Sequence, residues 1–147
     1  MSNYKKILEM WSSFQVKTQS DLEKYLSHFK ILFAYHSGKI ENQNVTYHDT
    51  REIFENGKVI SYTGDARTLF EQKNQKVCYD YLLLHLEKKT EITISFIKEV
   101  HRILTQGTYD ERRYLENDER PGKFKVGDYV TGIHEVGSAP VNLLNAI

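Results

Sequence analysis

An apolar pattern with the period of an α-helix recurs through the first 106 residues, and it constrains the fold more than any other feature of this sequence. Apolar side chains that return every three or four residues lie on one face of a helix and need a partner surface. The pattern predicts helices over about 4–15, 21–40, 47–56, 65–88 and 93–106. A chain of 147 residues with this pattern is expected to form one domain over 1–147 with a mainly α-helical fold.

Capping residues mark the ends of several predicted helices. Ser20 and Glu23 have the spacing of a capping box at the start of the second helix. Thr46, with Asp49 three residues later, is the N-cap candidate of the third helix. Gly57 is expected to end that helix. These signals place the third helix between Thr46 and Gly57.

The predicted helix over 65–88 is expected to turn one apolar side towards the core. Cys78, the only cysteine, lies in this helix, where a buried structural thiol is the expected role. A single cysteine excludes an internal disulfide and a zinc site of the cysteine-rich type. The side expected to be buried carries Leu69, Phe70, Val77, Tyr81, Leu84 and His85.

The character of the sequence changes after the fifth predicted helix. Residues 108–122 are highly charged and show no apolar period, so they are predicted to form a surface loop. β-branched and aromatic residues between glycines predict a pair of strands over 123–136. The turn of this pair could lie at Gly127-Asp128 or at Gly132.

Residues 138–147 are expected to begin a further helix, because Ser138 can cap it and Pro140 fits its first turn. The apolar face of this helix is incomplete at the last residue. On this pattern the sequence is either a piece of a longer protein or a naturally short chain.

The charge balance and the lack of long apolar runs exclude several classes of protein. Lys plus Arg and Asp plus Glu number 20 each, so the formal net charge is zero, which argues against binding to a nucleic acid backbone. No apolar run approaches the roughly 20 residues of a membrane span. The N-terminus lacks the apolar core of a signal peptide. The protein is expected to be cytoplasmic, with no nucleic acid or membrane partner.

Complete catalytic and metal-binding patterns are absent from the sequence. The six histidines are scattered, and His28 and His36 would stand about two turns apart on one helix, too far to chelate one ion. The glycines within 120–128 are not followed by a helix, so they do not form a phosphate-binding loop. No nucleophile elbow occurs. The sequence is therefore expected to hold no complete active site and no metal site.

Glu41 stands at the end of the second predicted helix. The partial negative charge of a helix C-terminus disfavours a carboxylate there by about 0.3–1 kcal/mol. From spacing alone, the favoured interpretation is a solvated helix end, with Asn42 in the left-handed position of the C-cap.

Three motifs, in this order along the chain, resemble those of the Fic (Fic/Doc) family. Their family forms are S-x-x-I-E-G-N-x-x-T, I-x-x-L-H-x-x-L and P-G-x-[YF]-[RK]. The resemblance covers roughly 20–147 and implies a Fic-like helical bundle with one β-hairpin, called the flap, over about 122–137. The matching residues are Ser37, Ile40, Glu41 and Asn44–Thr46, then Ile97, Val100, His101 and Leu104, and finally Pro121, Gly122, Phe124 and Lys125.

The resemblance also implies an activity. Fic proteins are typically adenylyltransferases that transfer AMP from ATP to a hydroxyl of a target protein (AMPylation) with Mg²⁺. Their signature loop, H-x-F-x-[DE]-G-N-G-R-x-x-R, supplies the general base, the metal-holding acid and the phosphate-binding arginines. This loop does not occur in the sequence. The chain alone is therefore expected to be inactive, with no catalytic residue of its own and with ATP and Mg²⁺ bound only by the longer protein.

The same resemblance implies a regulatory role for Glu41. Many Fic proteins carry [ST]-x-x-x-E-[GN] on an inhibitory helix, matched here by Ser37, Glu41 and Asn42 in the helix over about 21–41. Ser37 and Glu41 share one helix face. The carboxylate would grip the second arginine of the signature loop, which the γ-phosphate of ATP needs, and so autoinhibit the protein. Gly38 weakens the helix by about 1 kcal/mol relative to Ala, which would help this turn to open.

The flap is implied to bind the target protein by pairing its main chain with an extended target segment. Such pairing would place the receiving hydroxyl in line with the α-phosphate. The alternative interpretation is a non-catalytic Fic-like module that binds a partner protein. The candidate target-binding residues of the flap are Phe124, Lys125, Val126, Tyr129, Val130, Thr131 and Ile133.

Overall fold

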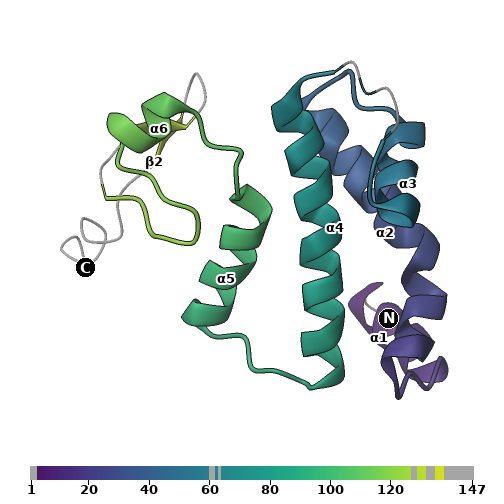
Figure 1. Ribbon diagram of the computed structural model, residues 1–147. Coiled ribbons are helices and arrows are strands. Elements are labelled where there is room, and N and C mark those ends of the chain that lie inside the picture. The colour runs from purple at the N-terminus through teal and green to yellow at the C-terminus, as the bar shows by residue number, and fades with distance from the viewer. Residues whose placement is uncertain (1–2, 60–61, 63, 127–128, 132–134, 138–147) are drawn as a thin grey trace.

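The computed structural model describes residues 3–59, 62, 64–126, 129–131 and 135–137. Within these ranges the chain is mainly helical. Figure 1 shows α2 beside α4, α5 on the opposite flank of α4, and α6 with the strands at the far edge. The elements are α1 (Asn3–Ser13), α2 (Gln19–Glu41), α3 (Tyr47–Asn56), α4 (Ala66–Glu87), α5 (Ile94–Thr105), α6 (Glu111–Leu115), β1 (Tyr129–Thr131) and β2 (Glu135–Gly137).

The core lies where α2, α3 and α4 meet. α4 contacts α2, α3 and α5, so it is the central helix of the bundle. Since these contacts are made by amphipathic faces, burial of apolar surface is the main force that assembles them. The buried apolar cluster consists of Ile31, Ala34, Ile53 and Phe54, with Tyr47, Val59, Leu69 and Tyr79 packed against it.

The five predicted helices are confirmed, but one predicted cap is wrong. Thr46 accepts a hydrogen bond from the backbone N–H of Asp49 at 3.0 Å, and Gly57 ends α3 with φ of 73°. The cap of α2 is Thr18, which accepts from the N–H of Asp21, while the Asp21 carboxylate accepts from the N–H of Thr18. Ser20 therefore lies inside the helix, because the same spacing two residues earlier satisfies two backbone donors at once.

The predicted buried side of α4 is partly wrong. Phe70, Val77 and Leu84 are exposed by 47%, 53% and 42%. The helix packs on α2 and α3 along one side and on α5 along another, so its buried positions do not follow a single apolar stripe. Cys78 is buried as expected, and burial raises the pKa of its thiol. The buried residues of α4 are Thr68, Gln72, Cys78 and Leu83.

The segment predicted as a surface loop contains the short helix α6. The carboxylate of Asp110 accepts a hydrogen bond from the backbone N–H of Arg113 at 2.9 Å and caps it. A helix of one turn is too short to show an apolar period, and its main sequence signal is the capping residue. The search for apolar periods therefore did not predict α6.

The strands β1 and β2 pair antiparallel, with Val130 opposite Val136. This register places their connection at 132–134, which contains Gly132, whereas Gly127-Asp128 precedes β1. The connecting residues, Gly127-Asp128 and the helix predicted over 138–147 lie outside the described residues.

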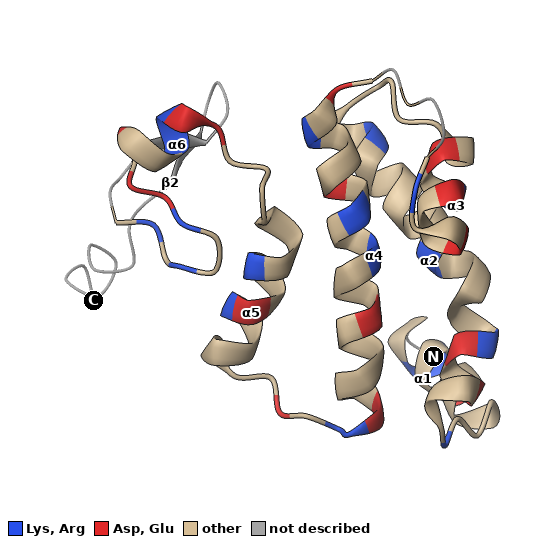
Figure 2. Ribbon diagram, in the orientation of Figure 1, with Lys and Arg blue, Asp and Glu red and all other residues tan. Residues whose placement is uncertain are grey.

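Charged residues of both signs occur along the helices. Figure 2 shows Lys and Arg interspersed with Asp and Glu along α4 and α5. Among the described residues, none of the helices combines the length and the apolar character needed to cross a membrane.

Candidate functional site

The last turn of α2 forms one wall of a pocket of about 300 Å³. Ser37, Gly38 and Glu41 line it from α2, and side chains of α4 line it opposite. Thr108, just after α5, and Arg113 of α6 close the remaining side. The structure thus brings Ser37 and Glu41 together on one face, as their spacing of four residues predicts.

The Glu41 side chain is exposed to solvent at this pocket and makes no hydrogen bond or ion pair with another described residue. Arg67 also lines the pocket, but its Nε lies 2.9 Å from Oε1 of Glu71 and is paired there. This hydrogen bond is the main cause of the raised pKa of Arg67, and Glu41 adds a smaller contribution through space. The carboxylate of Glu41 is therefore presented to the pocket without a cation bound to it.

Arg113, the other guanidinium at this pocket, also has partners. Its Nε lies 4.0 Å from Oε2 of Glu119, and its guanidinium carbon lies 4.7 Å from the ring centre of Tyr109. A cation over an aromatic face is attracted by the ring quadrupole. Both arginines of the described pocket are thus directed to groups other than Glu41.

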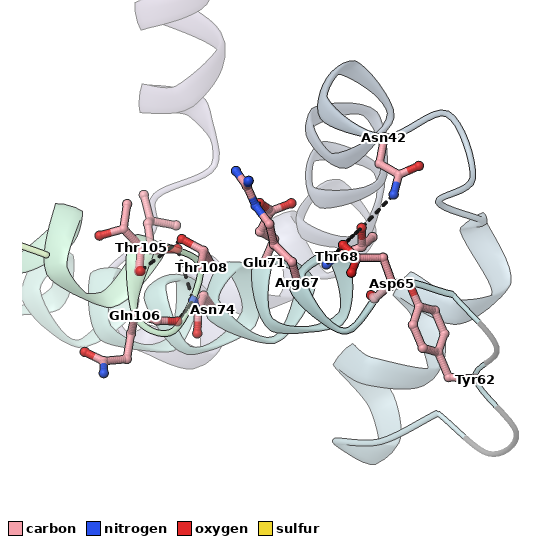
Figure 3. A network of polar contacts seen from close by, with 11 residues as sticks. Asn42, Tyr62, Asp65, Arg67, Thr68, Glu71, Asn74, Thr105, Gln106 and Thr108 are labelled. Atoms are coloured by element: carbon pink, nitrogen blue, oxygen red, sulfur yellow. Dashed lines mark hydrogen bonds and ion pairs between the residues drawn. The ribbon is translucent and has the colours of Figure 1, made fainter. Parts of the chain in front are cut away.

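Asn42 ends α2 in an extended conformation, with φ of −143° and ψ of 113°. The interpretation that it adopts the left-handed C-cap conformation is therefore wrong. The reason lies in its side chain: Nδ2 donates to Oγ1 of Thr68 at 2.6 Å, and Oδ1 accepts from the N–H of Asn44 at 2.9 Å. Figure 3 shows Asn42 directed at Thr68, next to Asp65. These two bonds fix the turn that follows Glu41.

Gly38 and Gln72 are in close contact, which spacing alone did not reveal. A Cβ atom on Gly38 would lie 2.1 Å from Nε2 of Gln72 and 3.4 Å from Val45. Gln72 is only 3% exposed and accepts a hydrogen bond from Thr50, which is fully buried. A side chain at position 38 would therefore displace the buried amide of Gln72, in addition to any effect on helix strength.

Two functional candidates on α4, Thr68 and Gln72, were missed by sequence reasoning. Both are buried polar residues that hydrogen-bond to the end of α2 or to its neighbours. They are four positions apart, so they lie on one face of α4. Residues 71–76 are all polar or charged, so no sequence signal separates the buried polar positions of α4 from the exposed ones.

The second and third motifs meet through His101. Nδ1 of His101 accepts a hydrogen bond from the backbone N–H of Gly122 at 3.0 Å, and Nε2 lies 3.3 Å from the hydroxyl of Tyr109. A ring nitrogen that accepts from a backbone amide is deprotonated there. His101 therefore anchors the turn that leads into the predicted flap.

The residues predicted for the flap occupy several places. The ring of Phe124 lies 4.1 Å from Nζ of Lys98 on α5, and Val126 is 61% exposed. Phe124 and Lys125 line a pocket of about 330 Å³ that also includes His101 and Arg113. Arg113 borders both this pocket and the one at Glu41. Of the remaining candidates, Tyr129, Val130 and Thr131 form β1, and Ile133 lies outside the described residues.

The hydrogen bonds of Asn74 join α4 to the end of α5. Its Nδ2 donates to the carbonyl oxygens of Leu104 and Gln106 at 3.1 and 2.7 Å. Figure 3 shows Asn74 beside Gln106. Leu104 lies in the last turn of α5 and Gln106 is the C-cap, and carbonyls at a helix C-terminus have no intrahelical donor. The described residues contain no group of three His, Cys, Asp or Glu side chains placed to hold a metal ion.

Comparisons with known proteins give information on the fold. No family model matches the sequence, and no curated protein matches it. Among solved structures, the chain is similar to a Fic domain-containing signaling protein from Bacteroides thetaiotaomicron, with a TM-score of 0.66 and 26% sequence identity. The match covers 98% of this chain and 52% of the other, so the chain spans about half the length of that protein. The chain therefore has a Fic-like fold.

Proposed function

We propose that this chain is the N-terminal and central part of a Fic-family protein adenylyltransferase, and that the end of α2 inhibits the whole protein. The reaction would be the transfer of AMP from ATP to a hydroxyl of a target protein. The observation that carries the proposal is the carboxylate of Glu41, which faces a pocket and forms no ion pair or hydrogen bond with the described residues.

Glu41 has the chemistry expected of a group that receives an arginine. A carboxylate and a guanidinium form two parallel, charge-assisted hydrogen bonds, which are about twice as strong as neutral ones. Arg67 pairs with Glu71, Arg113 lies 4.0 Å from Glu119, and neither forms an ion pair with Glu41. The arginine that Glu41 binds would therefore come from outside the described residues, and the family's signature loop supplies one.

Inhibition would follow from competition for this arginine. When the guanidinium is bound to Glu41, it cannot bind the γ-phosphate of ATP, so the nucleotide lies in an unproductive position. Opening of the last turn of α2 would release it. The contribution proposed for this chain is regulatory, because the signature loop that carries the family's general base does not occur in its sequence.

The strand pair β1–β2 is proposed to serve as the flap. Its position follows the Gly122 turn that His101 holds. A target segment added along a strand would be bound by main-chain hydrogen bonds, which suit many side-chain sequences and fix the direction of the target.

The test uses the full-length protein and ATP labelled on the α-phosphate. Glu41→Gly is expected to raise self-labelling about 10- to 100-fold, because a charge-assisted hydrogen bond contributes about 1.5–3 kcal/mol. Glu41→Gln keeps the size of the side chain and removes its charge, so it should activate as well. Glu55→Gly is the matched control, since Glu55 lies on α3 and pairs with Arg51. Equal labelling by the wild type and the Glu41 variants would refute the inhibitory role.

A second candidate function is a non-catalytic interaction module. The exposed apolar side chains of α4, among them Phe70 and Val77, favour contact with another protein surface. In that case neither the wild-type protein nor Glu41→Gly would label itself. A co-purifying partner would be lost on substitution of Val77 by Asp.

A further inference from the structure

We infer that three polar side chains of α4, Thr68, Gln72 and Gln75, position the last turn of α2 and thereby control how Glu41 is presented. They are positioning residues, because none of them contacts the carboxylate of Glu41 through a hydrogen bond. The inference rests on the proposed inhibitory function of Glu41. It adds to that function the device that holds the inhibitory turn closed.

Thr68 holds the residue that follows Glu41. Its hydroxyl is 2.6 Å from Nδ2 of Asn42 and 3.4 Å from Oδ2 of Asp65, the N-cap of α4. Thr68 is only 4% exposed, so the bond from Asn42 is shielded from water on one side. The backbone N–H of Asn42 donates to the carbonyl of Gly38 at 2.8 Å and closes the last turn of α2. Anchoring Asn42 therefore anchors the turn that carries Glu41.

Gln72 holds the turn before Glu41. Its Nε2 lies 3.5 Å from the carbonyl oxygen of Ala34, and its Oε1 accepts from the hydroxyl of Thr50 at 3.1 Å. The amide thus joins α2, α3 and α4 at one buried point. The amide occupies space that a Cβ atom at position 38 would take.

Gln75 completes the row of three. Its Nε2 donates to Oγ of Ser37 at 3.2 Å, four residues before Glu41. The three residues of α4 are three or four positions apart, so they form a continuous polar row on one face. Along α2 the row bonds to Ala34, Ser37 and Asn42, which lie on both sides of Glu41.

The polar row stabilises the last turn of α2, which two local effects destabilise. Glycine at position 38 weakens a helix interior, and a carboxylate at the C-terminus is disfavoured by the helix dipole. Glu41 gains no ion pair from the described residues in return. The turn is therefore closed by the bonds to α4, and loosening them should open it and release the arginine that Glu41 is proposed to hold.

The test compares Thr68→Val with Thr68→Ser in the full-length protein. Thr68→Val keeps the volume and removes the hydroxyl, so labelling from ATP should rise about 2- to 10-fold, as expected for the loss of one hydrogen bond. Thr68→Ser keeps the hydroxyl and should label like the wild type. Thr90→Val is the matched control. Thr90 lies just after the C-terminal end of α4, away from Glu41, and its hydroxyl bonds to His85 in the last turn of that helix. If Thr68 only stabilised the fold, Thr68→Val would lower both the stability and the labelling. The inference instead requires that the labelling of Thr68→Val rises.

Two further measurements make the outcome decisive. Amide hydrogen exchange over 36–45 should be faster in Thr68→Val than in the wild type, with no change in Thr90→Val. Adding Thr68→Val to Glu41→Gly should give no further activation, because both act on the same contact. Activation by Glu41→Gly with no effect of Thr68→Val overturns this inference and leaves the inhibitory role intact. A silent Glu41→Gly overturns the inhibitory role and this inference with it, and additive activation shows that Thr68 acts elsewhere and overturns the inference alone.

Discussion

Replacement of Gly38 by alanine tests the packing of α2 on α4, because helix propensity and tertiary contact predict opposite signs. In a helix interior alanine is favoured over glycine by about 1 kcal/mol. In this fold the added Cβ would lie 2.1 Å from Nε2 of Gln72, so the buried amide must move. Gln72 would then lose its bonds to Thr50 and Ala34, which leaves its buried Oε1 and Nε2 unpaired at about 1–3 kcal/mol each. This cost exceeds the gain of about 1 kcal/mol in helix propensity, so the expected net loss is about 1–5 kcal/mol.

The assay is urea unfolding followed by circular dichroism. With a slope of about 2 kcal/mol per molar urea, a loss of 2 kcal/mol lowers the midpoint by about 1 M. Ser27→Ala is the control, since Ser27 is exposed on the same helix. This substitution should raise the free energy of unfolding by a few tenths of a kcal/mol. In a Gln72→Ala background the space is open, so Gly38→Ala should become neutral or stabilising. A higher midpoint for Gly38→Ala alone would refute the close approach on which the reasoning rests.

Three further predictions concern the helix caps, the link between α4 and α5, and the core. Thr18→Ala should cost about 1 kcal/mol in the free energy of unfolding, while Ser20→Ala should change it little, since only Thr18 caps α2; equal effects would contradict this assignment. Asn74→Ala should lower the unfolding temperature by removing two hydrogen bonds to the end of α5, and faster exchange there would confirm the cause. Cys78 should react slowly with iodoacetamide at pH 8 in the folded protein and rapidly in urea, because burial shields the thiol and raises its pKa; rapid reaction of the folded protein would contradict its burial.

Local interactions explain why the helices could be predicted. The period of apolar residues and caps such as Thr46 and Gly57 act within one or two turns, so they can be read from neighbouring positions. The error at the start of α2 had the same local origin, since Thr18 and Ser20 both have an acidic residue three positions later. Only the backbone of the folded protein shows that Thr18, and not Ser20, is the N-cap of α2.

The sequence by itself determined the helical class, most helix boundaries and the placement of Ser37 and Glu41 on one face. The tertiary structure decided which side of α4 is buried, why position 38 is glycine and what holds Asn42 in an extended conformation. These depend on contacts between residues more than 20 positions apart, such as Asn42 with Thr68, and no short-range pattern encodes them. Packing of α2 on α4 brings those groups within hydrogen-bond distance, and burial then makes an unpaired polar atom costly enough to select one arrangement.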